Sequence, residues 1–375
     1  MMAYVSGLSS GDSRFLADLF PAIGAHLGLP GFGPDNIGLP DSRRYVVVLV
    51  DGLGWDLAIT AGRQAPYLAG LIGDAARVST GLPTTTAASL TSLWTGVMPG
   101  RHGIVGFSFA VGGRRRGGKW VRHLVRPLSV ERPILTAPSL LDQMVRGGIE
   151  VSCVVPPEHL NSGLTMMSSG LARMAGVEAG REQARVAEVA AAARRGERSL
   201  VYVYDARLDQ AGHRKGVASQ AWSLTLRQID GFLENLRAGL DDDVCLLVTG
   251  DHGMIDVAED DRIDIDKEPD LCAEVNLVGG EARFRHLYTG APGSVRDRWQ
   301  ARFGEQAAVL TREEAVEAGW FGEVDPAYLG RIGDVVAMPV AGLAFLSPGF
   351  PGEYLLVGMH GADTAAERYV PVLMD

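Results

Sequence analysis

The sequence predicts an α/β fold built on one large, mostly parallel sheet flanked by helices, and three observations support this. Short apolar runs rich in β-branched residues alternate with helix-length segments, which is typical of parallel strands buried on both faces. Several of these runs end in Asp, His or Gly, as strands do at the carboxyl edge of an open sheet. The length of 375 residues exceeds that of a usual compact domain. We therefore expect a large core with a smaller, partly antiparallel insertion.

The composition is that of an ordinary globular protein. Apolar residues make up 46% of the chain and charged residues 21%, which is ample material for a core. The net charge of -10 argues against a nucleic-acid-binding surface, and no apolar stretch is long enough to span a membrane. The 3 cysteines form no paired motif, and the N-terminus lacks a signal-peptide pattern. We expect a cytoplasmic protein that binds neither nucleic acid nor a membrane.

The chain divides into three expected parts. Residues 1–44 contain a short amphipathic helix and a Gly/Pro-rich connector, and we expect this helical preface to pack on the core. Residues 45–256 and 346–375 supply the strands and helices of the α/β core that carries the chemistry. Residues 257–345 begin with an acidic loop and continue with two helices and two short antiparallel strands, expected around the Gly279-Gly280 pair. We interpret this last part as the inserted subdomain.

Four apolar runs are each followed by residue types that bind metals. Residues 45–50 lead to Asp51, which can cap a helix or act as a ligand at the sheet edge. Residues 199–204 precede Asp209 and His213, whose four-residue spacing places them on one face of a helical turn. The recurrence of the pattern favours ligands over isolated caps. The other two runs, residues 244–248 and 355–361, supply Asp251, His252 and His360.

Thr86 stands at or just before the start of a helix expected over residues 87–95. Unpaired backbone N–H groups and the positive end of the helix dipole favour an oxyanion or a phosphate there. The Thr86 hydroxyl is either an ordinary helix cap or a nucleophile whose pKa a metal lowers. Because Thr84 and Thr85 are its neighbours, the sequence leaves the position of a nucleophile open by one residue.

Together these positions provide three carboxylates, three imidazoles and one hydroxyl. Mixed Asp/His sets are typical of Zn²⁺ or another first-row metal, whereas Mg²⁺ and Ca²⁺ prefer oxygen ligands alone. Two such ions about 4 Å apart are the usual arrangement for in-line displacement at phosphorus. Three carboxylates offset three of the four positive charges, so the site attracts a phosphate despite the negative net charge. The expected metal ligands are Asp51, Thr86, Asp209, His213, Asp251, His252 and His360.

A run of basic residues surrounds two Gly pairs between residues 110 and 126 and predicts a hairpin or flap. A solvated turn and a basic lid over an anionic substrate are both compatible with this pattern. Its basic residues are Arg114, Arg115, Arg116, Lys119, Arg122 and Arg126.

Four sequence blocks, followed by a late MHG, resemble the nucleotide pyrophosphatase/phosphodiesterase family of the alkaline phosphatase superfamily. They are VVLVDGLGWD, PTTTAASLTSLWTGVMPGRHGIVG, DQAGH and TGDHGM, and with MHG they run from about residue 45 to 361. The resemblance implies an alkaline-phosphatase-like fold, two zinc ions and a covalent intermediate on Thr86 that water hydrolyses. It also implies that Asp209, His213 and His360 bind one zinc, and that Asp51, Asp251 and His252 bind the other together with Thr86.

The chain departs from the family pattern at residues 87–90 and at Phe107. Ala87-Ala88-Ser89-Leu90 stands where members often carry an aromatic residue and Pro-Asn-His. Phe107 stands where well-known diesterases have an asparagine that holds a phosphate oxygen, which bears on nucleotide preference. Tyr204 falls where the family places a base-stacking aromatic, although an ordinary strand tyrosine also fits. We expect Phe107 and Tyr204 to contact the substrate.

The leading hypothesis is a two-metal phosphodiesterase or nucleotide pyrophosphatase that acts on a small organic phosphate or nucleotide-like substrate. Hydrolysis of a phosphonate of the phosphonoacetate type is an alternative within the superfamily. Hydrolysis of a phosphomonoester is another, and its extra charge would require a cationic clamp from the basic run. A metal-free binding scaffold is the non-enzyme alternative, but all seven expected positions carry competent side chains.

Overall fold

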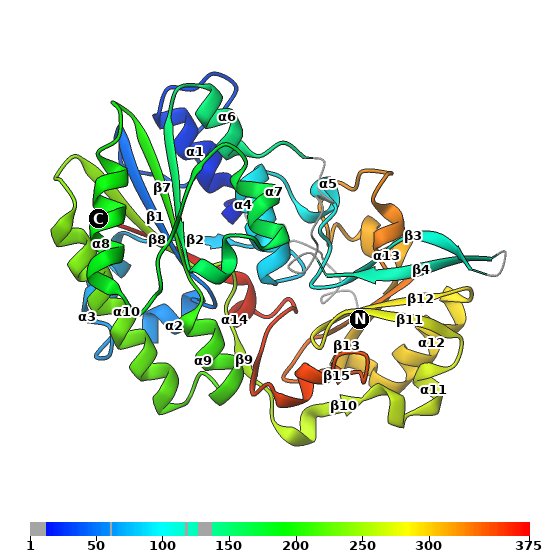
Figure 1. Ribbon diagram of the computed structural model, residues 1–375. Helices are drawn as coiled ribbons and strands as arrows, with labels where there is room; N and C mark the ends of the chain where they lie inside the picture. The colour runs from blue at the N-terminus through cyan, green and yellow to red at the C-terminus, as the bar shows by residue number, and fades with distance from the viewer. Residues whose placement is uncertain (1–12, 61, 117–118, 127–136) are drawn as a thin grey trace.

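A seven-stranded sheet organises the larger part of the molecule in the computed structural model, which describes residues 13–60, 62–116, 119–126 and 137–375 (Figure 1). Its strand order is β2-β17-β8-β1-β7-β5-β6. The strands from β8 to β6 pair in parallel, and β17 runs antiparallel to both of its neighbours. The strands are β1 (Arg44–Val50), β2 (Ala76–Ser79), β5 (Glu150–Val155), β6 (Arg173–Gly176), β7 (Ser199–Asp205), β8 (Val244–Thr249) and β17 (Tyr369–Met374).

Both faces of this sheet are covered, which explains why its central strands are apolar throughout. Along β1, Val47 packs into one core cluster and Val48 into the other. The first cluster is completed by η1 (Leu16–Asp18), α1 (Leu19–His26), α4 (Thr86–Thr95), α6 (Leu140–Arg146) and α7 (Gly163–Ser169). The second is completed by α2 (Trp55–Thr60), α3 (Pro66–Leu71), α8 (Glu182–Ala193), α9 (Arg207–Lys215) and α10 (Gln220–Gly239).

A smaller part lies beside the large sheet and is built on an antiparallel sheet of order β11-β12-β14-β13 (Figure 1). Aromatic residues fill its core, among them Phe284, Trp299 and Trp320. All of its elements fall within the residues expected to form the insertion. They are α11 (Pro269–Cys272), β11 (Val275–Glu281), β12 (Phe284–Thr289), α12 (Pro292–Phe303), β13 (Ala307–Thr311), α13 (Arg312–Glu317) and β14 (Val335–Pro339).

The turn between β11 and β12 is not at Gly279 and Gly280, so that prediction was wrong. Both glycines lie inside β11, and the two strands are joined at Ala282 and Arg283. Gly280 has a φ of 79°, and a Cβ there would lie 1.9 Å from the carbonyl oxygen of Phe284. The glycines therefore permit a close backbone approach within a strand, a use that sequence pattern does not distinguish from a turn.

The remaining strands and α-helices lie outside these two sheets. The β3–β4 hairpin extends along the smaller part (Figure 1), where the backbone N–H of Ala110 donates to the Tyr288 hydroxyl at 2.8 Å. Among the described residues, no helix is long and apolar enough to cross a membrane. The mixed architecture confirms the predicted fold class. These elements are β3 (Phe109–Arg116), β4 (Lys119–Val125), α5 (Pro99–His102), β9 (Ile255–Asp256), β10 (Arg262–Asp264), β15 (Ala344–Leu346), β16 (Gly358–Met359) and α14 (Ala365–Arg368).

Candidate metal centre

Three adjacent parallel strands deliver the acidic residues of the site to one edge of the sheet. In the centre, Leu49 of β1 is paired with Tyr204 of β7 and with Thr249 of β8. Because the three strands are in register, the segments that leave them meet beyond their carboxyl ends. Asp51, Asp209 and Asp251 lie on these three segments.

Hydrogen bonds donated by backbone N–H groups hold the three segments together. The N–H of Asp209 donates to the carbonyl of Asp51 at 3.0 Å, and the N–H of Gly52 donates to Oδ1 of Asp251 at 3.1 Å. Gly52 has a φ of 78°, and a Cβ on it would lie 3.1 Å from Cα of Asp209. A side chain at position 52 would therefore push the Asp209 segment away from the site.

His360 reaches the same edge from the end of the chain. It follows β16, which pairs antiparallel with β9, the strand just after His252. The next residue, Gly361, donates its N–H to the Thr84 hydroxyl at 3.0 Å. Further along, the buried Glu367 accepts from the N–H of Ala362 and forms a two-bond ion pair with Arg283. These contacts fix the His360 loop against the segment that carries Thr86.

Asp209, His213 and His360 form one group able to hold a metal ion. Oδ1 of Asp209 lies 3.2 Å from Nε2 of His213 and 3.9 Å from Nε2 of His360. The Nδ1 atoms of the two imidazoles face the carbonyls of Gly358 and Thr84, each at 2.8 Å. A backbone carbonyl at Nδ1 selects the tautomer that leaves Nε2 free as a ligand.

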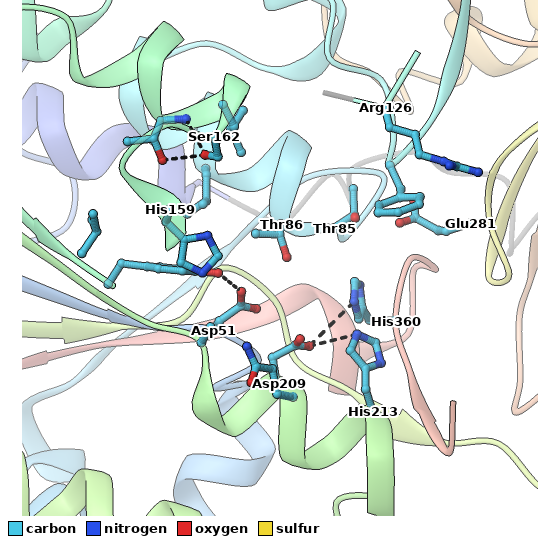
Figure 2. Close-up of a pocket in the computed structure, with 18 of the residues that line it drawn as sticks. Asp51, Thr85, Thr86, Arg126, His159, Ser162, Asp209, His213, Glu281 and His360 are labelled. Atoms are coloured by element: carbon cyan, nitrogen blue, oxygen red, sulfur yellow. Dashed lines mark hydrogen bonds and ion pairs between the residues drawn. The ribbon is translucent and has the colours of Figure 1, made fainter. Parts of the chain in front are cut away.

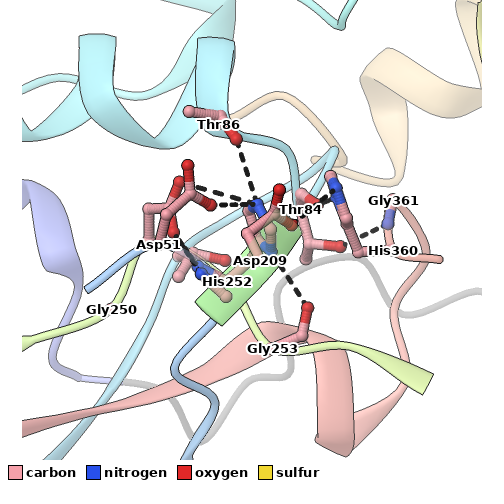
Figure 3. Close-up of polar contacts among 12 residues, drawn as sticks. Asp51, Thr84, Thr86, Asp209, Gly250, His252, Gly253, His360 and Gly361 are labelled. Atoms are coloured by element: carbon pink, nitrogen blue, oxygen red, sulfur yellow. Dashed lines mark hydrogen bonds and ion pairs between the residues drawn. The ribbon is translucent and has the colours of Figure 1, made fainter. Parts of the chain in front are cut away.

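Asp51, Asp209 and His252 form a second group. Nε2 of His252 lies 3.4 Å from Oδ1 of Asp51 and 3.5 Å from Oδ2 of Asp251, and its Nδ1 faces the Gly253 carbonyl at 3.0 Å (Figure 3). The rings of His252 and His360 stack, with centroids 3.6 Å apart. The two groups share Asp209 and so form one compact centre, whereas the family resemblance implies that Asp209 serves only the first ion.

The donor set fits divalent cations. Oδ1 of Asp51, Oδ1 of Asp209 and Oδ2 of Asp251 are buried and have no hydrogen-bond partner among the described residues. Burial, together with Asp251 and Asp209, raises the pKa of Asp51 well above its usual range, and burial also raises the pKa of Asp209. Burial and the neighbouring imidazoles hold the pKa of His360 well below 6.5. Three clustered buried carboxylates without a positive partner are costly, and bound cations remove that cost.

Thr86 is the threonine of its run that faces the ligands. Its Oγ1 lies 3.1 Å from Nε2 of His252 (Figure 3). The hydroxyl of Thr84 is buried and donates to the Ala362 carbonyl at 3.0 Å, and Thr85 is the N-cap residue of α4 although its side chain makes no capping bond. Thr86 is thus the first residue of α4, and its hydroxyl is directed to the metal centre.

A cavity of about 700 Å³ opens onto these residues and is lined by both expected substrate contacts, Phe107 and Tyr204. Tyr204 also contacts the metal centre, because its buried hydroxyl donates a hydrogen bond to Oδ2 of Asp51. Burial and the Asp51 carboxylate raise the pKa of Tyr204 well above 10. The phenol therefore stays protonated and acts as a donor to this ligand, a role that the sequence did not indicate.

The cavity has two unlike sides that sequence reasoning missed. His159 lies with Ser162 on one side of Thr86, and Arg126 and Glu281 lie on the other (Figure 2). Arg126 is the part of the basic run whose side chain is described, since the side chains of residues 113–123 fall outside the described set. Glu281 comes from β11 of the smaller part, so no local motif connects it with the metal ligands.

The fold and site define a metal-dependent phosphoester hydrolase of the alkaline phosphatase superfamily. The model of the type I phosphodiesterase/nucleotide pyrophosphatase family matches residues 45–363, and the chain belongs to this family. No curated protein sequence matches it.

Solved structures agree with this fold at low sequence identity. Murine ectonucleotide pyrophosphatase/phosphodiesterase 5 superimposes with a TM-score of 0.69 at 20% identity over 88% of this chain and 87% of that one. An inactive form of the same murine protein in complex with AMP has a TM-score of 0.67 at 19% identity over 88% and 87%. Phosphonoacetate hydrolase from Sinorhizobium meliloti 1021 in complex with phosphonoformate has a TM-score of 0.65 at 20% identity over 90% and 91%.

Proposed function

We propose that the protein is a two-zinc phosphodiesterase in which Thr86 is the nucleophile. The observation that carries this proposal is the position of the Thr86 hydroxyl, 3.1 Å from Nε2 of His252 and at the N-terminus of α4. Asp209, His213 and His360 would hold one ion, and Asp51, Asp251 and His252 the other, with Asp209 belonging to both groups of potential ligands. Two bound divalent ions would lower the pKa of the hydroxyl and stabilise negative charge on the phosphoryl oxygens.

The chain itself holds Thr86 and the metal-binding imidazoles in position. Thr86 is fixed by the first turn of α4, whose free N–H groups favour an anionic phosphoryl group beside it. The Nδ1 contacts of the three imidazoles keep their Nε2 atoms directed inward. Attack by Thr86 would form a bond from its Oγ1 to phosphorus and break the bond to the leaving alcohol. Water would then hydrolyse the resulting phosphodiester on Thr86 in a second displacement, which would release a phosphomonoester and restore the hydroxyl.

A singly charged diester suits the cavity better than a monoester. Arg126 is the single Arg or Lys among the described residues that line it, whereas Glu281 and Glu353 contribute carboxyl groups to the same lining. A dianionic monoester would require more positive charge than the Arg126 side chain provides. Phosphonate hydrolysis is the second candidate, because the solved structures of similar fold include a phosphonoacetate hydrolase.

The test is to compare three substrates on the zinc-loaded protein: bis(4-nitrophenyl) phosphate, 4-nitrophenyl phosphate and phosphonoacetate. We expect the diester to have the highest kcat/KM and its hydrolysis to disappear with a chelator and return with zinc. Preferred release of phosphate from phosphonoacetate would replace the diesterase assignment by the phosphonatase one. Equal rates with and without chelator would contradict both the diesterase and the phosphonatase assignment.

A further inference from the structure

The cavity extends from the metal centre into the hydrophobic core on one face of the large sheet. Nine of its lining residues belong to that core cluster, and we call the space enclosed by six of them the apolar chamber. Each has less than one-tenth of its surface exposed, so the chamber penetrates a layer that side chains normally fill. The six residues are Leu90 and Trp94 of α4, Leu141 of α6, Cys153 of β5, Leu164 of α7 and Tyr202 of β7.

Two residues of the chamber wall carry buried polar atoms. Nε1 of Trp94 and the hydroxyl of Tyr202 are buried and have no hydrogen-bond partner among the described residues. The two rings are in edge-to-face contact, with centroids 5.8 Å apart. Buried donors almost always have partners in a closed core. Two such donors without a partner in the described part of the chain are therefore an exception within the core that surrounds the chamber.

The cavity has one side with ionic side chains and one apolar side, and Thr86 lies between them. The ionic side chains outside the metal centre, Arg126, Glu281 and Glu353, come from β11 and from segments next to the smaller part. The apolar chamber contains none among its six defining residues. In Figure 2, His159 and Ser162 mark the chamber side of Thr86, and Arg126 and Glu281 mark the opposite side. An ionic group in the chamber would lose its hydration without a compensating charge.

We propose that the apolar chamber binds one of the two organic groups of the diester substrate, and that this group is an uncharged alkyl or aryl group. The inference rests on the proposed function, because it places the phosphoryl group at Thr86. From there the chamber leads into the core, and the volume of the whole cavity, about 700 Å³, lies in the range of cavities that enclose small organic ligands. Burying such a group removes apolar surface from water on both the ligand and the wall.

The proposal is tested by measuring phosphonate binding to the zinc-loaded enzyme by calorimetry. Alkylphosphonates are suitable because they contain no ester bond that the enzyme could hydrolyse. Methylphosphonate measures the metal centre alone, and hexylphosphonate adds a chain that reaches the chamber. Each buried methylene contributes about fourfold in affinity, so hexylphosphonate should bind at least about twentyfold more tightly. 6-Aminohexylphosphonate has the same six-carbon chain but a charged end, and it should lose most of this gain.

Two variants that fill the chamber supply the control. Cys153→Leu and Leu164→Phe add volume without removing a core side chain, and each should abolish the hexyl gain while leaving methylphosphonate affinity and zinc content unchanged. Two independent positions guard against one variant that fails to fold. The inference is overturned if hexyl- and methylphosphonate bind equally, if the gain survives in both folded variants, or if AMP binds more tightly than hexylphosphonate. Failure of the proposed function would differ, because methylphosphonate itself would then not bind.

Discussion

The hydroxyl oxygen of Thr86 lies 3.1 Å from Nε2 of His252, although the two residues are 166 positions apart in the chain. Thr86 begins α4, and His252 follows β8, the strand next to central β1. The contact therefore depends on the helix and the sheet edge being held in one arrangement. It also distinguishes Thr86 from Thr84 and Thr85, which the sequence alone could not do.

Replacing Thr86 tests this assignment. Thr86→Ala should lower kcat for the diester by at least about a thousandfold, because the attacking oxygen is gone. Thr86→Ser keeps a hydroxyl and should retain measurable activity. Thr91→Ala is the matched control, since Thr91 lies on the same helix and donates to the Ala87 carbonyl at 2.7 Å. Full activity of a Thr86→Ala protein with normal zinc content would rule out the nucleophile.

The Tyr204 hydroxyl should strengthen metal binding through Asp51. It donates to Oδ2 of Asp51, and loss of a partner of this kind typically weakens metal affinity about 10- to 100-fold. Tyr204→Phe should show this loss in a zinc titration against a competing chelator. Tyr202→Phe removes a neighbouring buried hydroxyl that has no partner among the described residues, and it should bind zinc as the wild type does. Equal affinities in the two variants would contradict the assigned role.

Glu281 should make stability depend on pH. Burial raises its pKa from 4.5 to about 8, with Glu353 adding to the rise and with Thr85, Arg285 and the Phe107 backbone opposing it. The folded state therefore binds a proton that the unfolded state releases, so this contribution is complete below about pH 4.5 and is lost as the pH rises through about 8.

Glu281→Gln removes the titration and keeps a neutral hydrogen-bonding side chain. The free energy of unfolding of the wild type minus that of the variant should fall by a few kcal/mol between about pH 5 and pH 9. Urea unfolding of both proteins at each pH measures the difference and cancels effects common to the two. A difference that stays constant or increases with pH would show that the Glu281 carboxyl is ionised in the folded protein.

The Arg283–Glu367 pair should be a major support of the His360 loop. Both side chains are 0% exposed and share two hydrogen bonds of 2.7 and 2.8 Å. Arg283→Met leaves a buried carboxylate unpaired and should cost about 3–5 kcal/mol in urea unfolding. Arg302→Met breaks the half-exposed pair with Glu268 and should cost less than about 1 kcal/mol. Equal effects would show that the buried pair is not what holds the loop.

The sequence predicted the large sheet and the candidate ligands because both depend on local patterns. Apolar runs ending in Asp or His are visible one at a time, and parallel strands in register bring their ends together. Glu281 could not be found in this way, since it reaches the cavity from β11 of the smaller part. The shared position of Asp209 between two groups and the apolar chamber are likewise products of tertiary packing. Gly279 and Gly280 were misinterpreted because a strand glycine and a turn glycine look alike in sequence.

Asp209 offers the most direct test of the metal centre, because it belongs to both groups of potential ligands. The measurement is the zinc content per chain of the purified protein and of Asp209→Ala after equilibration with zinc and removal of excess metal. The account predicts close to two zinc ions per wild-type chain and a loss from both positions in the variant. A wild-type protein that retains no zinc, or an Asp209→Ala protein that still retains two, would contradict it.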